Sequence, residues 1–135
     1  MRFISFAWTV PALLAGAKTV TRRAWKASHA ERFSSGELVS AFDKDPRAGG
    51  KKIGEIRLTR APYLEDVADM PAADYAGEGF AYFERHPEEL PANAPQWMHG
   101  LTRERFSDTG LLYDDMGFRG EDLWVVRFEL VSESG

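Results

Sequence analysis

The chain is built from short β-rich segments separated by short helical ones, with no regular strand–helix–strand repeat. Its clearest strand is residues 123–131, where valine, phenylalanine and leucine follow one tryptophan. Residues 2–6, 37–42 and 53–59 also favour strands, and the last of these alternates apolar and polar side chains. This order predicts an α+β fold, a small mixed β-barrel with flanking and inserted short helices.

The segments between the strands predict short helices and loops. Thr9 is a candidate N-cap, Pro11 suits a first helical turn and Gly16 suits a helix end. Thr102 is a second candidate cap, and Trp25 and Phe33 are candidate inward-facing residues. We expect helices at 9–16, 24–33, 64–70, 70–83 and 101–107, a polar basic connection at 18–23, a loop at 86–95 and turns at 114–122.

The length and composition indicate one globular domain that spans residues 1–135. Hydrophobic residues make up 44% and charged residues 28%, which is typical of a folded chain. No apolar stretch approaches the roughly 20 residues that a membrane helix needs, and no secretory leader is evident. The absence of cysteine excludes disulfides, thiolate metal sites and cysteine nucleophiles. We therefore expect a soluble, cytoplasmic protein without a membrane partner.

The formal net charge of −4 conceals an uneven distribution. Residues 1–60 hold 12 Lys or Arg against 5 Asp or Glu, whereas residues 61–135 hold 5 against 16. Such a split indicates either a local surface that faces anions, or two halves of one fold that pair with each other.

The basic half contains a short motif, Gly16-Ala17-Lys18-Thr19-Val20-Thr21-Arg22-Arg23. It resembles the Gly-x-Lys-x-x-Thr-x-Arg signature of the ASCH domain family, and Gly16, Lys18, Thr21 and Arg23 stand in register. Glu78-Gly79-Phe80 is similar to the Glu-Gly-Phe element of the same family. Residues 35–39, 53–56 and 122–126 also fit, so the resemblance covers most of the chain.

The resemblance implies a PUA-like β-barrel and a role in RNA binding or in reactions on RNA and nucleosides. One branch of the family hydrolyses N4-acetylcytidine with a lysine, a threonine and a glutamate, which correspond to Lys18, Thr21 and Glu78. Other members are reported as ribonucleases. This chain is longer than the amidohydrolase branch, mainly between residues 84 and 120, which leaves the substrate open.

Hydrolysis by these residues makes physical demands. A threonine hydroxyl is a weak nucleophile and needs a base, and a lysine serves as one only when its amine is neutral. Burial and like charge from Arg22 and Arg23 would lower the pKa of Lys18, whereas an ionised Glu78 would raise it. Glu78 would carry a proton to the leaving amine or orient Lys18, and either arginine could steady an oxyanion. Because Lys18 and Thr21 are three residues apart, we expect a turn-like backbone between them.

Further residues are candidates for substrate binding. Trp8 and Trp25 flank the motif and could stack on bases, although packing in the core is the commoner role of a tryptophan. Tyr82 would lie one helical turn beyond Glu78 and could line a pocket. Arg22 and Arg23, with Lys18 and Lys26, could equally form a phosphate-binding patch without chemistry, and Thr21 could be an ordinary strand residue.

The sequence predicts no metal site and no other cofactor for the hydrolase. The three histidines show no ligand spacing. Glu88–Glu89 or Asp114–Asp115 could hold Mg²⁺ or Mn²⁺ in a ribonuclease, but adjacent acids are usually solvated surface.

The sequence thus favours a domain that binds a nucleoside or single-stranded RNA, acting as an amidohydrolase on N-acylated cytidine. The alternatives are a metal-assisted ribonuclease and a non-catalytic RNA-binding regulatory module.

Overall fold

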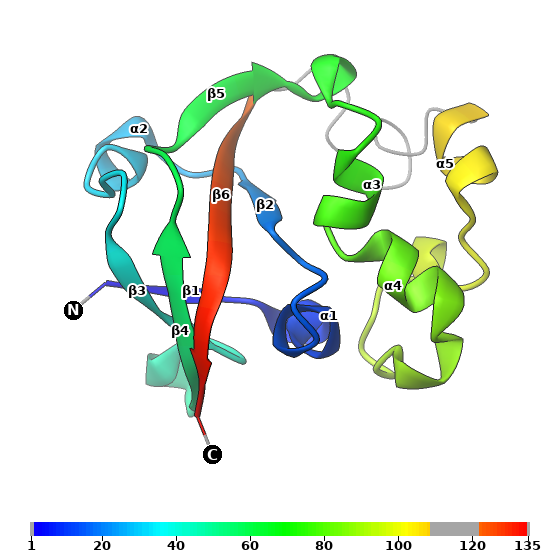
Figure 1. The fold of residues 1–135 in the computed structure, drawn as a ribbon, viewed down its shortest axis with the longest axis horizontal. Coiled ribbons are helices and arrows are strands. Elements are labelled where there is room, and N and C mark those ends of the chain that lie inside the picture. Colours follow the sequence, from blue (N-terminus) through cyan, green and yellow to red (C-terminus); the bar gives the residue numbers. More distant parts are fainter. Residues whose placement is uncertain (1, 109–121, 135) are drawn as a thin grey trace.

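The computed structural model describes residues 2–108 and 122–134. Six strands form one curled sheet, a half-barrel, and short helices pack around it (Figure 1). The expected α+β class, a small curled sheet with short helices, is confirmed. The strands are β1 (Phe3–Ser5), β2 (Val20–Arg23), β3 (Leu38–Phe42), β4 (Lys52–Leu58), β5 (Tyr63–Asp66) and β6 (Asp122–Glu133).

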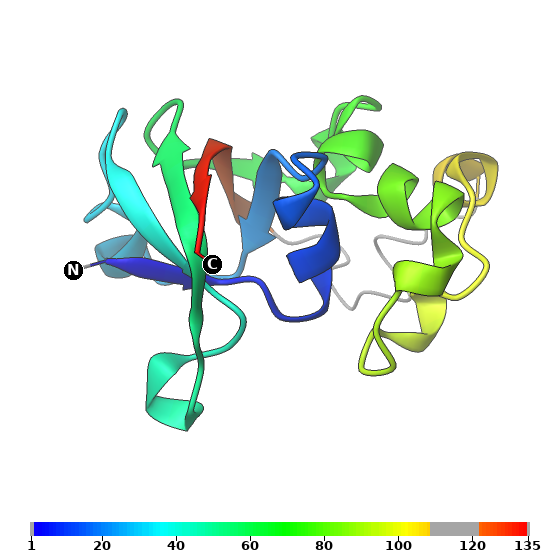
Figure 2. The same cartoon turned by 60° about the horizontal axis from the view of Figure 1, so that its bottom comes forward.

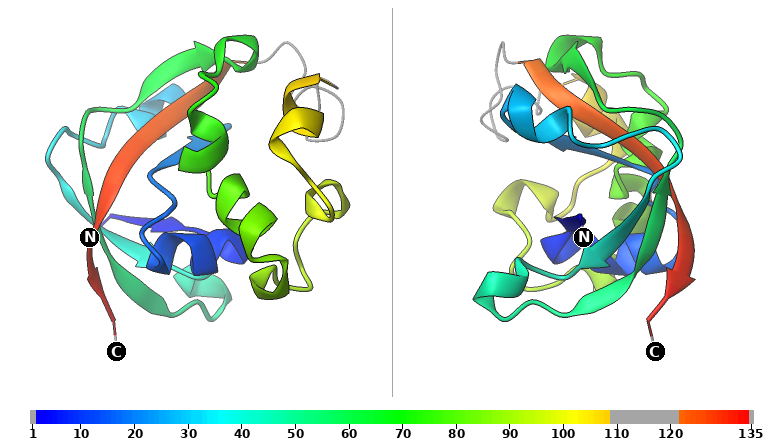
Figure 3. Two further views of the ribbon diagram at one scale, coloured as in Figure 1. Left: turned by 45° about the vertical axis from the view of Figure 1, so that its right-hand side comes forward. Right: turned by 90° about the vertical axis from the view of Figure 1, so that its left-hand side faces the viewer.

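The long strand β6 organises the sheet. The strand order is β1-β3-β4-β6-β2, and β5 also pairs with β6. The first part of β6 lies between β2 and β5, since Val125 is opposite both Arg22 and Tyr63. Its later part pairs with β4, where Leu58 is opposite Phe128. All pairs are antiparallel except β1 with β3, and β6 crosses the molecule diagonally in Figure 3.

The helices gather in separate groups around the sheet. Three of them, α3, α4 and α5, lie together on one side, and α2 lies at the opposite end (Figures 1 and 2). The α-helices are α1 (Val10–Leu14), α2 (Ala27–Ala30), α3 (Asp74–Gly77), α4 (Phe80–Arg85) and α5 (Arg103–Asp108). The 3-10 helices are η1 (Ala7–Thr9), η2 (Pro46–Ala48), η3 (Val67–Asp69), η4 (Pro87–Glu89) and η5 (Gln96–Met98). In the described ranges, none of these helices has the length and apolar character needed to cross a bilayer.

Two main hydrophobic cores hold these elements. The sheet core contains Phe6, Phe33 and Phe128, and Trp25 packs against it. The helical core contains Tyr75, Phe80 and Phe83. Trp8 packs against this second core, with its ring stacked on Phe80 at 6.3 Å. Large aromatic side chains thus contribute to both cores.

Three expected elements differ from the structure in type or in continuity. Residues 20–23 form strand β2 rather than a connection, because this β-branched stretch pairs with residues 124–127 of β6. Residues 63–66 form strand β5 before the 3-10 helix η3, again by pairing with β6. The helix expected at 70–83 is divided into α3 and α4, because Gly79 has a left-handed backbone with φ of 96°.

The expected caps are confirmed in part. The Oγ1 of Thr102 accepts a hydrogen bond from the backbone N–H of Arg105 at 3.2 Å. Thr9 does not cap α1 with its side chain, because its hydroxyl donates backwards to the carbonyl of Phe6 at 2.6 Å. The helix expected at 24–33 is only the four-residue α2, although Phe33 is buried as expected. The turns expected at 114–122, with Asp114–Asp115, lie outside the described residues apart from Asp122.

Candidate active site

A cavity of about 260 Å³ lies where strand β2 meets the helical core. The elements that bound it are far apart in sequence: the segment from β1 to η1, the residues from Lys18 to Arg23, and the junction of α3 and α4. Phe6 of the sheet core and Phe80 of the helical core both line it. The lining residues are Ser5, Phe6, Ala7, Trp8, Thr9, Lys18, Thr21, Arg22, Arg23, Glu78 and Phe80.

The turn that follows α1 directs Lys18 into the protein. Gly16 takes a φ of 76°, which a residue with a side chain rarely adopts. The backbone N–H of Lys18 then donates to the carbonyl of Ala12 at 3.1 Å, and that of Thr19 donates to Gly77 at 2.8 Å. Lys18 is only 2% exposed as a result.

Two glycines bring Glu78 against this turn. A Cβ at Gly77 would lie 2.9 Å from Cγ1 of Val20, and one at Gly79 would lie 2.8 Å from the Cβ of Ala12. Only glycine allows α3 and α4 to approach β2 and α1 so closely. The sequence Gly77-Glu78-Gly79 therefore places the Glu78 carboxylate beside Lys18, and Glu78 is 8% exposed.

Glu78 contacts two cations of the motif at once. The Nζ of Lys18 donates to the Glu78 carbonyl oxygen at 2.9 Å and to its Oε1 at 3.2 Å. Nη1 of Arg22 donates to Oε2 of Glu78 at 2.9 Å. The carboxylate is thus held at both oxygens, one toward the lysine and one toward the arginine.

A buried carboxylate that the sequence did not single out supports Arg22. Asp74 is 4% exposed and accepts a hydrogen bond from Nη2 of Arg22 at 2.6 Å. It also accepts two hydrogen bonds from Arg127 on β6, at 3.0 and 2.8 Å. Glu65 of β5 accepts from Arg22 as well, at 2.8 Å. This network fixes Arg22 and ties α3 to three strands of the sheet.

Thr21 and Arg23 lie on the face of β2 opposite to that of Arg22. Nε of Arg23 donates to Oγ1 of Thr21 at 3.1 Å, and Nη2 donates to the Ser5 carbonyl at 2.6 Å. Thr21 is 4% exposed, and its hydroxyl proton is not used by that hydrogen bond. The threonine therefore presents an oriented hydroxyl at the cavity that Lys18 also lines.

Burial and neighbouring charges shift several pKa values in this network. Burial lowers the pKa of Lys18, Glu78 opposes the shift, and Arg23 and Arg22 add to it. Burial also lowers the pKa of Arg23, to about 10. Although burial has a lowering effect on the pKa of Arg22 too, the combined effect of its carboxylate partners is larger, so the pKa of Arg22 is raised. For Asp74 burial raises the pKa, yet hydrogen bonds from Arg127 and Arg22 bring it below the usual range.

Most of the predicted site residues line this cavity, and two of them lie outside it. Lys18, Thr21 and Glu78 all line the cavity, together with Trp8, Arg22 and Arg23. Trp25 lies instead in a second cavity, where its ring stacks on Phe33 at 5.1 Å. Tyr82 does not line the first cavity either, because its hydroxyl points away to Oε2 of Glu89, at 2.6 Å. The turn-like backbone expected between Lys18 and Thr21 is not found, since Thr21 lies within strand β2.

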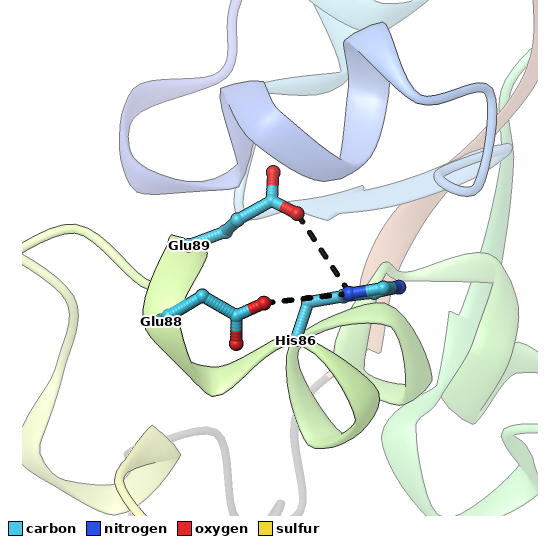
Figure 4. Close-up of side chains that lie close together, drawn as sticks. All are labelled: His86, Glu88 and Glu89. Atoms are coloured by element: carbon cyan, nitrogen blue, oxygen red, sulfur yellow. Dashed lines mark ion pairs between the residues drawn. The ribbon is translucent and has the colours of Figure 1, made fainter.

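A possible metal-binding group lies elsewhere, at the start of η4. Nδ1 of His86 is 3.6 Å from Oε1 of Glu88 and 3.9 Å from Oε2 of Glu89 (Figure 4). Potential ligand atoms of the three residues lie within 4.8 Å of one another, and the side chains are exposed. Glu88 and Glu89 are singled out by the sequence as adjacent acids, but His86 was not predicted to join them. None of the three residues lines the cavity with Lys18, so this group lies outside the candidate active site.

Comparison with known proteins identifies a similar fold. Among solved structures, the chain is similar to protein EF3133 from Enterococcus faecalis V583, which is assigned to the family DUF984, with a TM-score of 0.54. The sequence identity is 16%, and the match covers 96% of this chain and 76% of the other. No family model matches the chain, and no curated protein matches it. The likeness supports the fold alone.

Proposed function

We propose that this chain is an ASCH-type amidohydrolase that removes the acyl group from the exocyclic amine of an N-acylated cytidine. The observation that carries the proposal is the cavity that buries Lys18 beside Glu78 and is also lined by Thr21. The six predicted residues that line this cavity come from the motif, from the Gly-Glu-Gly turn and from η1.

The hydrogen bonds around Lys18 suit a base. A neutral amine has two N–H groups and one lone pair. Glu78 offers two acceptors, its carbonyl and its carboxylate, at 2.9 and 3.2 Å from Nζ. When both accept from the neutral amine, its lone pair is left for a proton from the cavity. Burial, which lowers the pKa of Lys18, favours this neutral form.

The proposed reaction has two balanced stages. Oγ1 of Thr21 attacks the acyl carbon as its proton passes to Lys18, and Arg23 steadies the oxyanion. The carbon–nitrogen bond then breaks and Lys18 returns the proton to the leaving exocyclic amine, which gives cytidine and an acyl ester on Thr21. Water, deprotonated by Lys18, then attacks the ester carbon. The bond to Oγ1 of Thr21 breaks, Lys18 returns the proton to that oxygen, and the carboxylic acid is released. Glu78 orients the amine of Lys18 throughout.

The size of the cavity fits a small reacting group. Pockets for small molecules are commonly about 300 to 1,000 Å³. A cavity of about 260 Å³ falls just below that range, so it suits an acylated base better than a large ligand.

The test is incubation with N4-acetylcytidine, followed by chromatography for cytidine. We expect release by the wild-type protein and none by Lys18→Arg, because an arginine does not deprotonate. Thr21→Ala should also abolish release, and Arg85→Ala, an exposed cation on α4, should not change it. Mass spectrometry should find an acyl group on Thr21. No cytidine from the wild-type protein, or full activity of Lys18→Arg, would remove the proposal.

The alternatives predict other results. A metal-assisted ribonuclease would cleave labelled RNA only with Mg²⁺ or Mn²⁺. A binding module would retain RNA in a salt-dependent manner in both Lys18→Ala and Thr21→Ala, and would turn over neither substrate.

A further inference from the structure

A second cavity of about 260 Å³ adjoins the first on the side of α2. It lies between strand β1, the residues from Arg23 to Phe33, and the loop that joins β3 to β4. Its lining residues are Arg2, Phe3, Ile4, Ser5, Arg23, Trp25, His29, Arg32, Phe33, Asp45 and Arg47.

The wall of this cavity is strongly cationic in a chain of net charge −4. Four arginines line it against one carboxylate, Asp45, which is paired with Arg47 at 2.8 Å. Arg2 uses Nη1 to pair with Glu37 at 3.0 Å. The exposed Arg32 has no side-chain partner within the described residues. Guanidinium groups with unused donors recognise phosphate oxygens well.

Aromatic rings stand beside these cations. Trp25 and Phe33 stack with ring centroids 5.1 Å apart and an angle of 12°, and His29 meets the edge of Trp25 at 4.7 Å. Because Phe33 belongs to the sheet core, it holds Trp25 at the cavity wall. Flat apolar surface next to arginines is a feature of sites that bind nucleotides.

Two residues are shared by the cavities, Ser5 and Arg23. The Arg23 guanidinium bonds to Ser5 on one side and to Thr21 on the other, at 2.6 and 3.1 Å. The two cavities therefore share part of one wall, and a ligand whose reacting group contacts Thr21 lies next to the second cavity. A phosphate attached to a substrate in the first cavity would therefore lie close to the arginines of the second.

We propose that the second cavity binds a nucleotide phosphate, so that the substrate is an acylated cytidine nucleotide rather than the free nucleoside. The base assignment depends on the function proposed above, whereas the phosphate site depends only on this cavity. The phosphate belongs either to a mononucleotide or to an RNA strand, and both present the same anion to Arg2 and Arg32.

The kinetic test compares kcat/KM for N4-acetylcytidine, its 5′-monophosphate, its 3′-monophosphate and a short single-stranded RNA that contains the modified base. We expect at least one phosphorylated substrate to exceed the nucleoside by about tenfold or more, mainly through KM, since a hydrogen bond to a charged group contributes that much. The preferred substrate identifies the source of the phosphate. Equal values for all four would overturn the proposal.

Variants of Arg32 localise the effect. Arg32→Ala, alone and with Arg2→Ala, should reduce kcat/KM for the phosphorylated substrate toward the value for the nucleoside and leave the nucleoside value unchanged. Arg85→Ala removes an equal charge from α4 and should change neither value. A loss of the same size with the nucleoside, or with Arg85→Ala, would contradict a phosphate site at this cavity.

Binding separates the two proposals if no hydrolysis is seen. In calorimetry, cytidine 5′-monophosphate, cytidine 3′-monophosphate and a short RNA should each be compared with cytidine. At least one should bind more tightly to the wild-type protein, and lose that advantage in Arg32→Ala. This result without turnover would support the phosphate site and remove the hydrolase. If the protein hydrolyses the substrates but a phosphate improves neither binding nor rate, the hydrolase would be supported and the phosphate site would be removed.

Discussion

Lys18 combines deep burial with two hydrogen bonds to a single residue. It is 2% exposed, and both acceptors of its amine belong to Glu78. An ammonium removed from water is strongly disfavoured, and one carboxylate shared with Arg22 compensates only in part. Lys18 is therefore the residue whose protonation state should govern the reaction.

The pH dependence of kcat/KM should report this lysine. A free lysine titrates near 10.4, and burial lowers the pKa of Lys18 below that value. In the proposed reaction the neutral amine is the active form, so kcat/KM should rise with pH through the lowered pKa and then level off. Rates measured with N4-acetylcytidine from about pH 5 to 10 would show the rising limb below the ordinary lysine range. A limb centred at 10.4, or no limb, would contradict Lys18 as the base.

Asp74 should matter for stability more than any motif residue. Removing its charge leaves Arg22, whose side chain is 5% exposed, and Arg127 without their shared partner. Breaking a buried ion pair on one side typically destabilises by about 3 kcal/mol or more. Asp74→Asn should lose about 3 kcal/mol in urea unfolding, whereas Glu129→Gln, at an exposed position on β6, should stay within about 0.5 kcal/mol. Equal losses would show that the network is not a stabilising one.

The residues of the site could be predicted unevenly from the sequence. The motif resemblance selected Lys18, Thr21 and Glu78, which the structure brings to one cavity. Asp74 and Arg127 were missed because nothing in their local sequence marks them, and their pairing at 2.8 Å depends on how α3 packs on β6. Trp25 and Tyr82 are close to site residues in sequence, but the backbone directs their side chains elsewhere.

The junction of α3 and α4 is the element on which the geometry of the site depends. Gly79 has a φ of 96°, and a Cβ added to it would lie only 2.8 Å from the Cβ of Ala12. Gly36 has a similar φ of 81° but open space around it. A substitution at Gly36 thus tests backbone strain alone, whereas one at Gly79 tests backbone strain together with the steric contact to Ala12.

Gly79→Ala should therefore destabilise more than Gly36→Ala. The left-handed backbone alone penalises a side chain by about 1 to 2 kcal/mol, and this should be the whole effect at Gly36. At Gly79 the contact with Ala12 adds to it and displaces Glu78, so kcat should also fall. Urea unfolding and N4-acetylcytidine turnover of both variants measure the difference. Equal stability and full activity of Gly79→Ala would contradict this role.

The same junction explains why the sequence predicts one helix where the structure has two. Residues 70–83 were predicted as one helix, and the left-handed backbone of Gly79 divides it. The glycines of this junction also leave room for Val20 and Ala12, which the sequence alone does not place there. The helical turn predicted at 64–70 is wrong over strand β5 for a similar reason, since the pairing of β5 with β6 joins residues about sixty positions apart. Strands with their own alternating pattern, such as β4, were predictable without that information.

At the scale of the molecule, the two oppositely charged halves of the sequence do pair. Lys18 and Arg22 come from the basic half, and their partners Glu65, Asp74 and Glu78 come from the acidic half. The arginines around Arg32 are the part of the basic half that this pairing leaves facing a cavity. Both interpretations of the charge pattern thus have a counterpart in the fold.

This pairing should make the fold sensitive to acid. The pKa of Asp74 is lowered in the folded protein, so its contribution is present above the unfolded value of about 3.9 and is lost as the pH falls through the lower, folded value. The free energy of unfolding should therefore drop below about pH 4 more steeply for the wild type than for Asp74→Asn. Urea titrations across this range measure both slopes. Parallel curves would mean that Asp74 titrates alike in both states.

Strand β6 comes last among the described elements, yet it hydrogen-bonds with β2, β4 and β5. During synthesis, the earlier strands emerge from the ribosome without the neighbour they share. The wall that holds Thr21 and the buried Asp74–Arg127 pair cannot form until residues 122–133 have emerged. Assembly of this candidate site should consequently be slow, because most of the contacts that form it join residues far apart in the sequence.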